Sequence, residues 1–299
     1  IIASAKTVIF EINEHLPFLP GVDGSNLCRL DDADMIVEGT HSPLPERNYR
    51  APSEIDQTIA ELVVNEIPDG AVLSLGVGTV PFAIASALAD SDKRDLGCHT
   101  GTISDAYQKL YLAGKLTNAR KEFDTGLSSF NLAMGSAAFY DWLRENPKLF
   151  RPDSIDYIHD PARIGKLSRV ISINGGVQVD LMGQENAESA NGMQLSGIGG
   201  QMDFLEGAFR SEGGCGYICI NSSRLTKDGV RKSNILPFIP GGSTVSAPRT
   251  LIEAVATEYG IAHLAGKSLA ERREAMIAIA HPDFRDALRL EKPDLSLFL

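Results

Sequence analysis

The first segment of this sequence that could bind a ligand lies where a predicted strand meets a helix. The run at 73–81 leaves a strand through two glycines separated by one residue and then starts a helix. Free backbone N–H groups at a helix start attract an anion, although the third glycine of a dinucleotide-binding fingerprint is absent. A plain strand-to-helix turn is the alternative. The candidate binding residues are Gly76, Val77, Gly78, Thr79 and Val80.

A second segment, at 195–204, places three glycines within four residues before another predicted helix. Such a loop can aim backbone N–H groups at a carbonyl oxygen and stabilise an oxyanion. A flexible loop without a ligand is the alternative. The candidate residues are Gly197, Gly199 and Gly200.

Titratable side chains near other strand ends supply candidate acids and bases. His99 is a candidate general base, with a structural histidine as the alternative. In the segment at 172–184 the strand period places Gln178 and Asp180 on one face. Asp180 is a candidate acid, with a capping role as the alternative.

A basic cluster and a nearby amide complete the candidates for binding a ligand. The sequence Lys-Asp-Gly at 227–229 indicates a hairpin turn. The basic cluster consists of Lys227 in this turn with Arg231 and Lys232 after it. They are suited to phosphate groups, and a solvated hairpin is the alternative. Asn174, near a predicted strand end, is a further candidate binding residue.

The composition narrows the class of protein. A net charge of -11 gives no basic footprint for duplex nucleic acid. The four cysteines have no zinc-site spacing, so we expect reduced thiols and no metal. No apolar run is long enough to span a membrane, and no signal peptide is visible. We therefore expect a cytoplasmic protein with no membrane or nucleic-acid partner.

The elements that must position these residues alternate between strands and helices. This alternation predicts an α/β domain, with helices flanking a mostly parallel sheet. The predicted strands cover 7–12, 34–37, 71–75, 96–99, 169–173, 177–182, 217–221, 235–239 and 244–247. The predicted helices cover 53–67, 81–88, 104–116, 136–145 and 268–280, with a last one starting at 282.

Six motifs follow one another along the chain: Gly76–Pro81, His99–Asp105, Ser172–Gln184, Ser196–Phe204, Thr257–Ala262 with Gly266 and Lys267, and Ile279–Arg285. Their collinear order resembles the acetyl-CoA hydrolase/transferase family, which includes 4-hydroxybutyrate and acetate CoA-transferases. The resemblance implies two related α/β domains with the active site between them. Residues 1–37 would then be the tail of a first domain, 38–52 a linker and 53–299 a second CoA-transferase-type domain. We expect a further segment or a separately encoded chain before Ile1, and a homo-oligomer or a hetero-oligomer with an N-terminal-domain chain.

The same resemblance assigns roles to positions in this sequence. It implies that coenzyme A is bound at the Gly-x-Gly turn and that the Gly-x-Gly-Gly loop faces the thioester. The family's nucleophilic glutamate, which carries CoA as a thioester, matches Gly101, and a second, usually acidic position matches Gln178. Glycine has no side chain, so a covalent glutamyl intermediate cannot form at Gly101.

Three hypotheses follow, with acyl-CoA and in one case a small carboxylate as ligands. The first is a CoA-thioester enzyme that uses non-covalent chemistry, such as hydrolysis, decarboxylation or carbon–carbon cleavage, with His99, Asp180 or Glu185 as base. The second is an ordinary CoA-transferase whose acid comes from Glu185, Glu188 or a first-domain residue. The third is a non-catalytic subunit that completes the active site of a partner.

Overall fold

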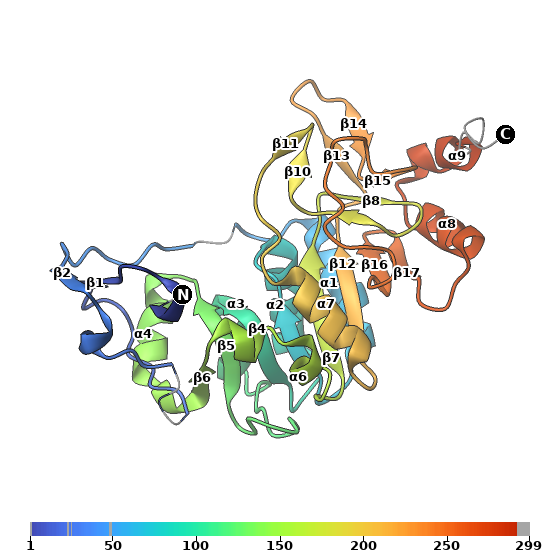
Figure 1. Ribbon diagram of the computed structural model, residues 1–299. Coiled ribbons are helices and arrows are strands. Elements are labelled where there is room, and N and C mark those ends of the chain that lie inside the picture. Colours follow the sequence, from blue (N-terminus) through green and yellow to red (C-terminus); the bar gives the residue numbers. More distant parts are fainter. Residues whose placement is uncertain (1, 23, 25, 48–49, 292–299) are drawn as a thin grey trace.

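A computed structural model describes residues 2–22, 24, 26–47 and 50–291 of the chain, and an eight-stranded sheet forms its centre (Figure 1). The strands are β3 (Val72–Leu75), β4 (Gly97–Ile103), β5 (Ser128–Ala133), β6 (Phe150–Pro152), β7 (Val170–Gly175), β12 (Cys215–Cys219), β16 (Ala254–Thr257) and β17 (Gly260–His263). Their order is β17-β16-β12-β7-β3-β4-β5-β6. All neighbours are parallel except the antiparallel edge pair β16–β17. The mostly parallel α/β sheet predicted from the sequence is confirmed.

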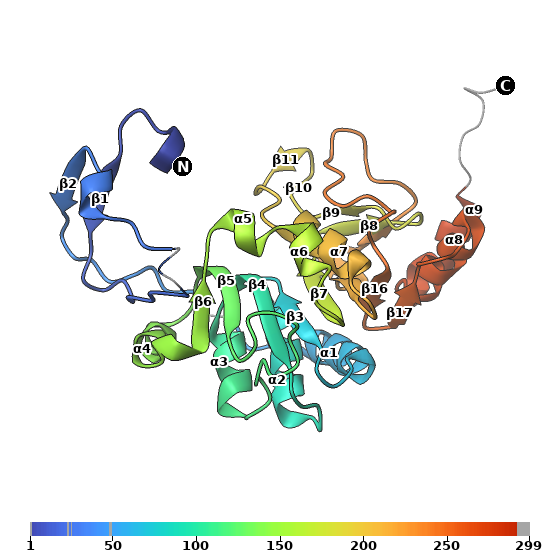
Figure 2. The ribbon, with the colours of Figure 1, turned by 60° about the horizontal axis from the view of Figure 1, so that its bottom comes forward.

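Helices cover both faces of the sheet, with α1, α2 and α3 on one side and α6 and α7 on the other (Figure 2). Two helix starts carry a capping box, Ser53 with Asp56 and Ser268 with Glu271, and each such cap stabilises its helix by about 1 kcal/mol. The α-helices are α1 (Glu54–Glu66), α2 (Thr79–Asp90), α3 (Asp105–Leu112), α4 (Ala137–Glu145), α5 (Ile155–Ile158), α6 (Pro161–Ile164), α7 (Gln201–Arg210), α8 (Leu269–Ala278) and α9 (Pro282–Leu290). The short 3₁₀ helices are η1 (Ile2–Ser4), η2 (Leu30–Asp32) and η3 (Pro147–Leu149).

The sheet separates two apolar cores because successive side chains of a strand point to opposite faces. Leu73 of β3 packs with Ile59 and Ile84, which come from the helices α1 and α2. The preceding residue, Val72, packs on the other face with Phe204 of α7. Full burial of an aliphatic side chain of this size stabilises the fold by about 1.5–3 kcal/mol, so the strand is held from both sides.

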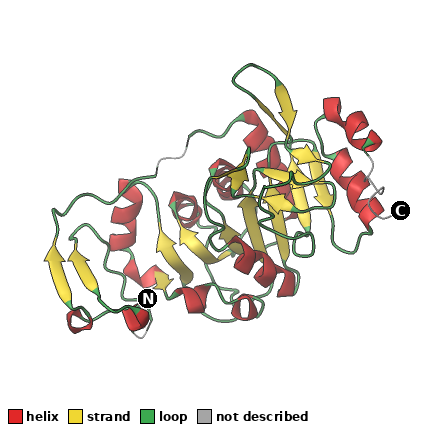
Figure 3. Cartoon of the chain, turned by 45° about the horizontal axis from the view of Figure 1, so that its top comes forward, coloured by secondary structure: helices red, strands yellow, loops and turns green. Residues whose placement is uncertain are grey.

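Smaller sheets lie outside this framework. The parallel pair β1 (Ile9–Ile12) and β2 (Met35–Glu38) lies at one end of the molecule, and α8 and α9 lie at the other (Figures 1 and 3). The division into domains at residues 37 and 53 stays a prediction. The remaining strands are β8 (Gln178–Asp180), β9 (Glu185–Asn186) and β15 (Ile235–Leu236) in one sheet, and the hairpins β10 (Ser189–Ala190) with β11 (Met193–Gln194) and β13 (Ser223–Leu225) with β14 (Arg231–Ser233).

Some predicted elements differ from the structure. The strand predicted at 244–247 is wrong, since only Ala247 forms an isolated bridge, to Glu185. The strands β5 and β6 were not predicted. β5 contains polar residues such as Ser128 and Asn131 among its apolar ones, and β6 has three residues, so neither shows a clear strand period.

The strand order reverses direction between β3 and β7. The chain runs outward from β3 through β4, β5 and β6, and then returns to place β7 on the other side of β3. In open α/β sheets a ligand binds at the carboxyl ends of the strands where the order reverses. Because Leu75 is paired with Ile173, this position falls between Gly76 and Asn174.

Candidate functional site

The turn after β3 brings the backbone at Gly76 against β7. The Gly76 N–H donates to the carbonyl of Ile173 over 2.8 Å. A Cβ on Gly76 would lie 3.1 Å from that oxygen and 3.3 Å from Oδ1 of Asn174, so the close approach favours glycine. Gly78 is the N-cap of α2 and has no side chain to cover the helix start. The first-turn N–H groups of α2 are therefore open to an anion.

Two glycines shape the loop before α7. Gly199 has a φ of +60°, a left-handed conformation that favours glycine. A Cβ on Gly200 would lie 2.6 Å from Nδ1 of His159, so a larger residue would displace that imidazole. Neither glycine N–H donates to an acceptor within the described part of the chain. Both groups are therefore available to a ligand oxygen.

His159 follows α5 and is paired with a carboxylate on α7. Its Nδ1 atom lies 3.0 Å from Oδ2 of Asp203. An ionised carboxylate only accepts hydrogen bonds, so Nδ1 carries the proton and Nε2 of the neutral ring has a lone pair. The Nε2 atom is buried, and no described residue forms a hydrogen bond with it. The ring also packs edge-on against Phe204, with centroids 5.0 Å apart.

Gly101 lies in β4 directly beside this imidazole. A Cβ on Gly101 would lie 3.0 Å from Nε2 of His159 and 3.3 Å from Cε2 of Phe204. Even alanine would therefore crowd the ring, and a longer side chain would compete with His159 for space.

These segments surround one cavity of about 600 Å³, called the main cavity below. It lies at the reversal of strand order and is closed by the loop before α7. Among the described residues that line it there is no Asp or Glu. The two glycine-rich segments thus share one cavity, as the sequence interpretation requires. The residues selected from the sequence that line it are Gly76, Val77, Gly101, Asn174, Gly197, Gly199 and Gly200.

A second cavity of about 630 Å³, called the basic cavity below, adjoins the first, since Val77 and Gly175 line both. The open helix start at Gly78, Thr79 and Val80 lies in its wall. Three arginines and one aspartate are its charged lining residues in the described chain, an excess of positive charge suited to an anion. These charged residues are Arg50, Asp56, Arg224 and Arg231.

Lys227 does not lie in the predicted phosphate-binding position. It is exposed in the turn between β13 and β14 and lines neither cavity. Arg231, on the same hairpin, lines the basic cavity and donates to Oγ of Ser223 over 2.9 Å. The hairpin thus presents Arg231 to this cavity, and the choice of Lys227 is corrected.

His99 also lies outside both cavities. Its side chain is fully buried, and Nε2 lies 2.9 Å from the carbonyl oxygen of Ile158. Burial lowers the pKa of His99 to about 3, because a charged imidazole is disfavoured away from water. His99 does not line the main cavity. This placement favours the structural role that was the alternative, and the role of His99 as a base stays a prediction.

The polar residues of β8 belong to local structure. Gln178 lines neither cavity and is paired in register with Asn186. Oδ1 of Asp180 accepts from the N–H groups of Met182 and Gln184, each over 2.9 Å. Asp180 therefore has the capping role that was the alternative to acid chemistry.

Glu185 lies behind the loop before α7 rather than in the main cavity. Its Oε2 accepts a hydrogen bond from Nε2 of Gln201, and its Oε1 has no partner among the described residues. Burial raises the pKa of Glu185 to about 8, since the charged form loses its hydration. Glu188 is bound by the hydroxyl of Ser246 over 2.6 Å. Neither glutamate lines the main cavity.

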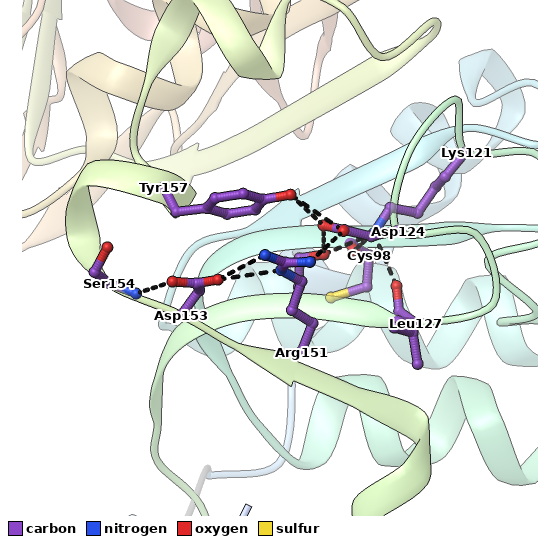
Figure 4. A network of polar contacts seen from close by, with 9 residues as sticks. Cys98, Lys121, Asp124, Leu127, Arg151, Asp153, Ser154 and Tyr157 are labelled. Carbon is purple, nitrogen blue, oxygen red and sulfur yellow. Dashed lines mark hydrogen bonds and ion pairs between the residues drawn. The ribbon is translucent and has the colours of Figure 1, made fainter. Parts of the chain in front are cut away.

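A buried polar network fixes the segment that carries His159 (Figure 4). Arg151 lies 3.2 Å from Asp124 and 2.9 Å from Asp153. The hydroxyl of Tyr157, in α5, donates to Asp124 over 3.1 Å, and the Arg151 guanidinium lies 4.1 Å from the Tyr157 ring centroid. Because His159 follows Tyr157 by two residues, these contacts help to hold its backbone in place.

The sequence analysis did not select His159 or Asp203. The two residues are 44 positions apart. Asp203 lies in the segment at 195–204, which was selected for its glycines, whereas the segment around His159 was not selected. The available signals were a histidine just before the Asp-Pro start of α6 and an aspartate soon after the glycine loop. Neither signal indicates that the two side chains meet.

Metal and membrane features are absent within the limits of the described chain. In that part, no three His, Cys, Asp or Glu side chains gather in a way that could hold a metal ion. No described helix is long and apolar enough to cross a membrane. Cys28, Cys98, Cys215 and Cys219 are all free thiols.

Comparison with known proteins shows which proteins this chain is similar to. The family model for the acetyl-CoA hydrolase/transferase C-terminal domain matches residues 135–292. The chain is 41% identical over 291 residues to the butyryl-CoA:acetate CoA-transferase of Anaerostipes caccae, covering 96% of this chain and 64% of that protein. It is 40% identical over 288 residues to the 4-hydroxybutyrate coenzyme A transferase of Clostridium kluyveri, covering 96% and 65%.

The solved structures give a matching result. RipA from Yersinia pestis superposes with a TM-score of 0.87 at 37% identity, covering 97% of this chain and 63% of that one. The chain thus spans slightly less than two thirds of the length of these relatives.

Proposed function

This chain belongs to the acetyl-CoA hydrolase/transferase family, and on that premise we propose that it binds an acyl-CoA and hydrolyses the thioester without a covalent glutamyl intermediate. One observation carries the proposal: no described Asp or Glu lines the main cavity, whose wall includes Gly101. The sequence resemblance matches Gly101 with the family's glutamate. The covalent route needs a carboxylate as nucleophile. Without one in the cavity wall, water is the nucleophile.

The two adjoining cavities suit the two ends of an acyl-CoA. The phosphates would bind in the basic cavity, against the start of α2 and the side chains of Arg224 and Arg231. Backbone N–H groups and guanidinium groups are the donors that phosphate oxygens prefer. The pantetheine arm would pass Val77 and Gly175, which line both cavities, and carry the thioester into the main cavity.

The loop before α7 would act on the thioester carbonyl. The N–H groups of Gly199 and Gly200 have no acceptor within the described chain, so they would donate to the carbonyl oxygen. Fixed donors of this kind stabilise the negative charge that develops on that oxygen during attack, and losing one costs about 10²- to 10³-fold in kcat.

A panel of acyl-CoA esters tests the proposal. The purified protein is incubated with each ester in H₂¹⁸O, thiol release is followed, and the acid product is weighed by mass spectrometry. Hydrolysis predicts one thiol and one ¹⁸O atom per turnover, with no glutamate side chain reduced to its alcohol by borohydride. No thiol release from any ester would refute hydrolysis and would favour a non-catalytic subunit.

A second candidate is an acyl-CoA:carboxylate CoA-transferase, because the two relatives compared above carry transferase names. The nucleophilic carboxylate would then come from outside the described wall of the main cavity. Adding a small carboxylate such as acetate to the same incubation separates the two candidates. Formation of acetyl-CoA together with a labelled glutamate peptide would support the transferase and refute water as the nucleophile.

A further inference from the structure

Three separate contacts orient the imidazole of His159. Asp203 holds Nδ1 at 3.0 Å, Phe204 packs edge-on against the ring, and Gly200 supplies the space for Nδ1, since a Cβ there would lie 2.6 Å away. The side chain is 12% exposed. A ring fixed in this way has one nitrogen left for chemistry, which is Nε2.

That nitrogen lies beside Gly101, which the sequence resemblance matches with the family's glutamate. Nε2 lies 3.0 Å from where a Cβ on Gly101 would be, and no described residue forms a hydrogen bond with it. A buried polar atom without a partner is costly unless a ligand or water satisfies it. The main cavity, which His159 lines, can supply such a water.

We infer that His159 is the general base of this site and that Asp203 positions it, an inference that rests on the hydrolysis proposed above. A histidine whose Nδ1 proton is held by a carboxylate presents Nε2 as acceptor, and the carboxylate stabilises the imidazolium that forms. Asp203 does not touch the substrate and acts only through His159. Arg47 is the other charged side chain that lines the main cavity in the described chain.

The step balances without any further reactant. Nε2 of His159 takes a proton from water as the water oxygen bonds to the thioester carbon. The carbonyl oxygen becomes an oxyanion held by the N–H groups of Gly199 and Gly200. When the carbon–sulfur bond breaks, the imidazolium returns its proton to the leaving sulfur, giving the free thiol of CoA and a carboxylic acid.

Two substitutions test the roles of the pair. His159→Gln should lower kcat by about 10²- to 10⁴-fold, leave CoA affinity by calorimetry within twofold, and abolish the acidic limb of the pH profile of kcat/KM. Asp203→Asn should lower kcat with KM within twofold, because its amide can donate to Nδ1 and leave the ring proton on Nε2, whereas Asp203→Glu should restore part of the activity. A purely structural role for Asp203 would change KM together with kcat.

A second histidine–carboxylate pair provides the matched control. His263 Nε2 lies 2.9 Å from Glu66 Oε1, and neither residue lines the main cavity. His263→Gln should leave kcat, KM and the pH profile unchanged. If His159→Gln behaves like this control while the wild-type protein hydrolyses acyl-CoA, the inference is overturned and the proposed function stands.

Alkylation tests the placement of Nε2 without turnover or variants. Bromoacetyl-CoA bound with its carbonyl in the main cavity should alkylate Nε2 of His159, forming a nitrogen–carbon bond and releasing bromide. Peptide mass spectrometry should find the label on His159, and free CoA should protect against it. If another residue is labelled, or if no residue is labelled at saturating reagent, the inference is overturned. If His159 is labelled but no ester releases a thiol, the inference stands and the proposed hydrolysis is refuted.

Discussion

Replacing Glu185 by glutamine should remove a pH-dependent loss of stability that is built into this fold. Glu185 is fully buried, and the one hydrogen-bond partner of its side chain among the described residues is Gln201. Burial raises its pKa from 4.5 to about 8. Glutamine has nearly the same shape, keeps an oxygen for the Gln201 donor and cannot ionise.

The size of the effect follows from the difference in the pKa of Glu185 between the folded and the unfolded protein. Between pH 4.5 and about 8 the folded protein keeps the Glu185 proton, whereas the unfolded chain releases it. Stability therefore falls as pH rises, by about 1.4 kcal/mol per pH unit. From pH 5.5 to 7.5 the wild-type protein should lose about 3 kcal/mol relative to Glu185→Gln. Below the unfolded pKa both forms are neutral, and the difference disappears.

Urea unfolding of the two proteins at pH 5.5 and pH 7.5 measures this change. Other titrating groups contribute equally to both proteins, so they cancel in the difference between their unfolding free energies. Glu61→Gln, at an exposed position of α1, is the control and should give the same difference at both pH values. The difference in unfolding free energy between the wild type and Glu185→Gln could also be the same at pH 5.5 and pH 7.5. Glu185 would then ionise freely in the folded state, and the reasoning about its burial would be refuted.

Three further predictions concern the cavities and the network beneath them. Gly101→Ala should lower the kcat of thiol release by at least about tenfold, because its Cβ would lie 3.0 Å from Nε2 of His159; an unchanged kcat would contradict the placement of that nitrogen. Arg231→Ala should weaken CoA binding by about tenfold but not the binding of pantetheine, which lacks the nucleotide phosphates; calorimetry with both ligands decides this. Lys121→Met should reduce the unfolding free energy by about 2–4 kcal/mol, because Nζ donates to the carbonyls of Cys98 and Leu127 at 2.9 and 2.8 Å. Urea unfolding measures this change, and an unfolding free energy equal to that of the wild type would show that these carbonyls find other donors.

Local patterns were sufficient to predict much of the sheet and its turns. β3 is a mostly apolar run that ends just before Gly76, where an added Cβ would lie 3.1 Å from the Ile173 carbonyl oxygen of β7, so glycine is favoured. Capping residues such as Ser268 marked a helix start that the structure confirms. These features depend on residues that are neighbours in the chain, so their types and spacing carry the information.

The candidate base could not be predicted in the same way. Nothing in the segments around His99 and His159 separates a buried structural imidazole from one that faces a cavity. In the structure each ring has one paired nitrogen and one nitrogen without a partner among the described residues, which is Nδ1 of His99 and Nε2 of His159. What separates the two histidines is that His159 lines the main cavity and His99 does not. Which nitrogen is left open depends on the packing of distant elements.

The sequence by itself determined the alternation of strands and helices, the two glycine-rich segments and the absence of a side chain at Gly101. Only the tertiary structure decided that these segments share one cavity, and that Asp203 reaches His159 across 44 positions of the chain. The physical reason is that strand order and helix packing bring distant residues together. A single residue's type fixes its chemistry, whereas its partners, burial and access to a ligand are set by the fold.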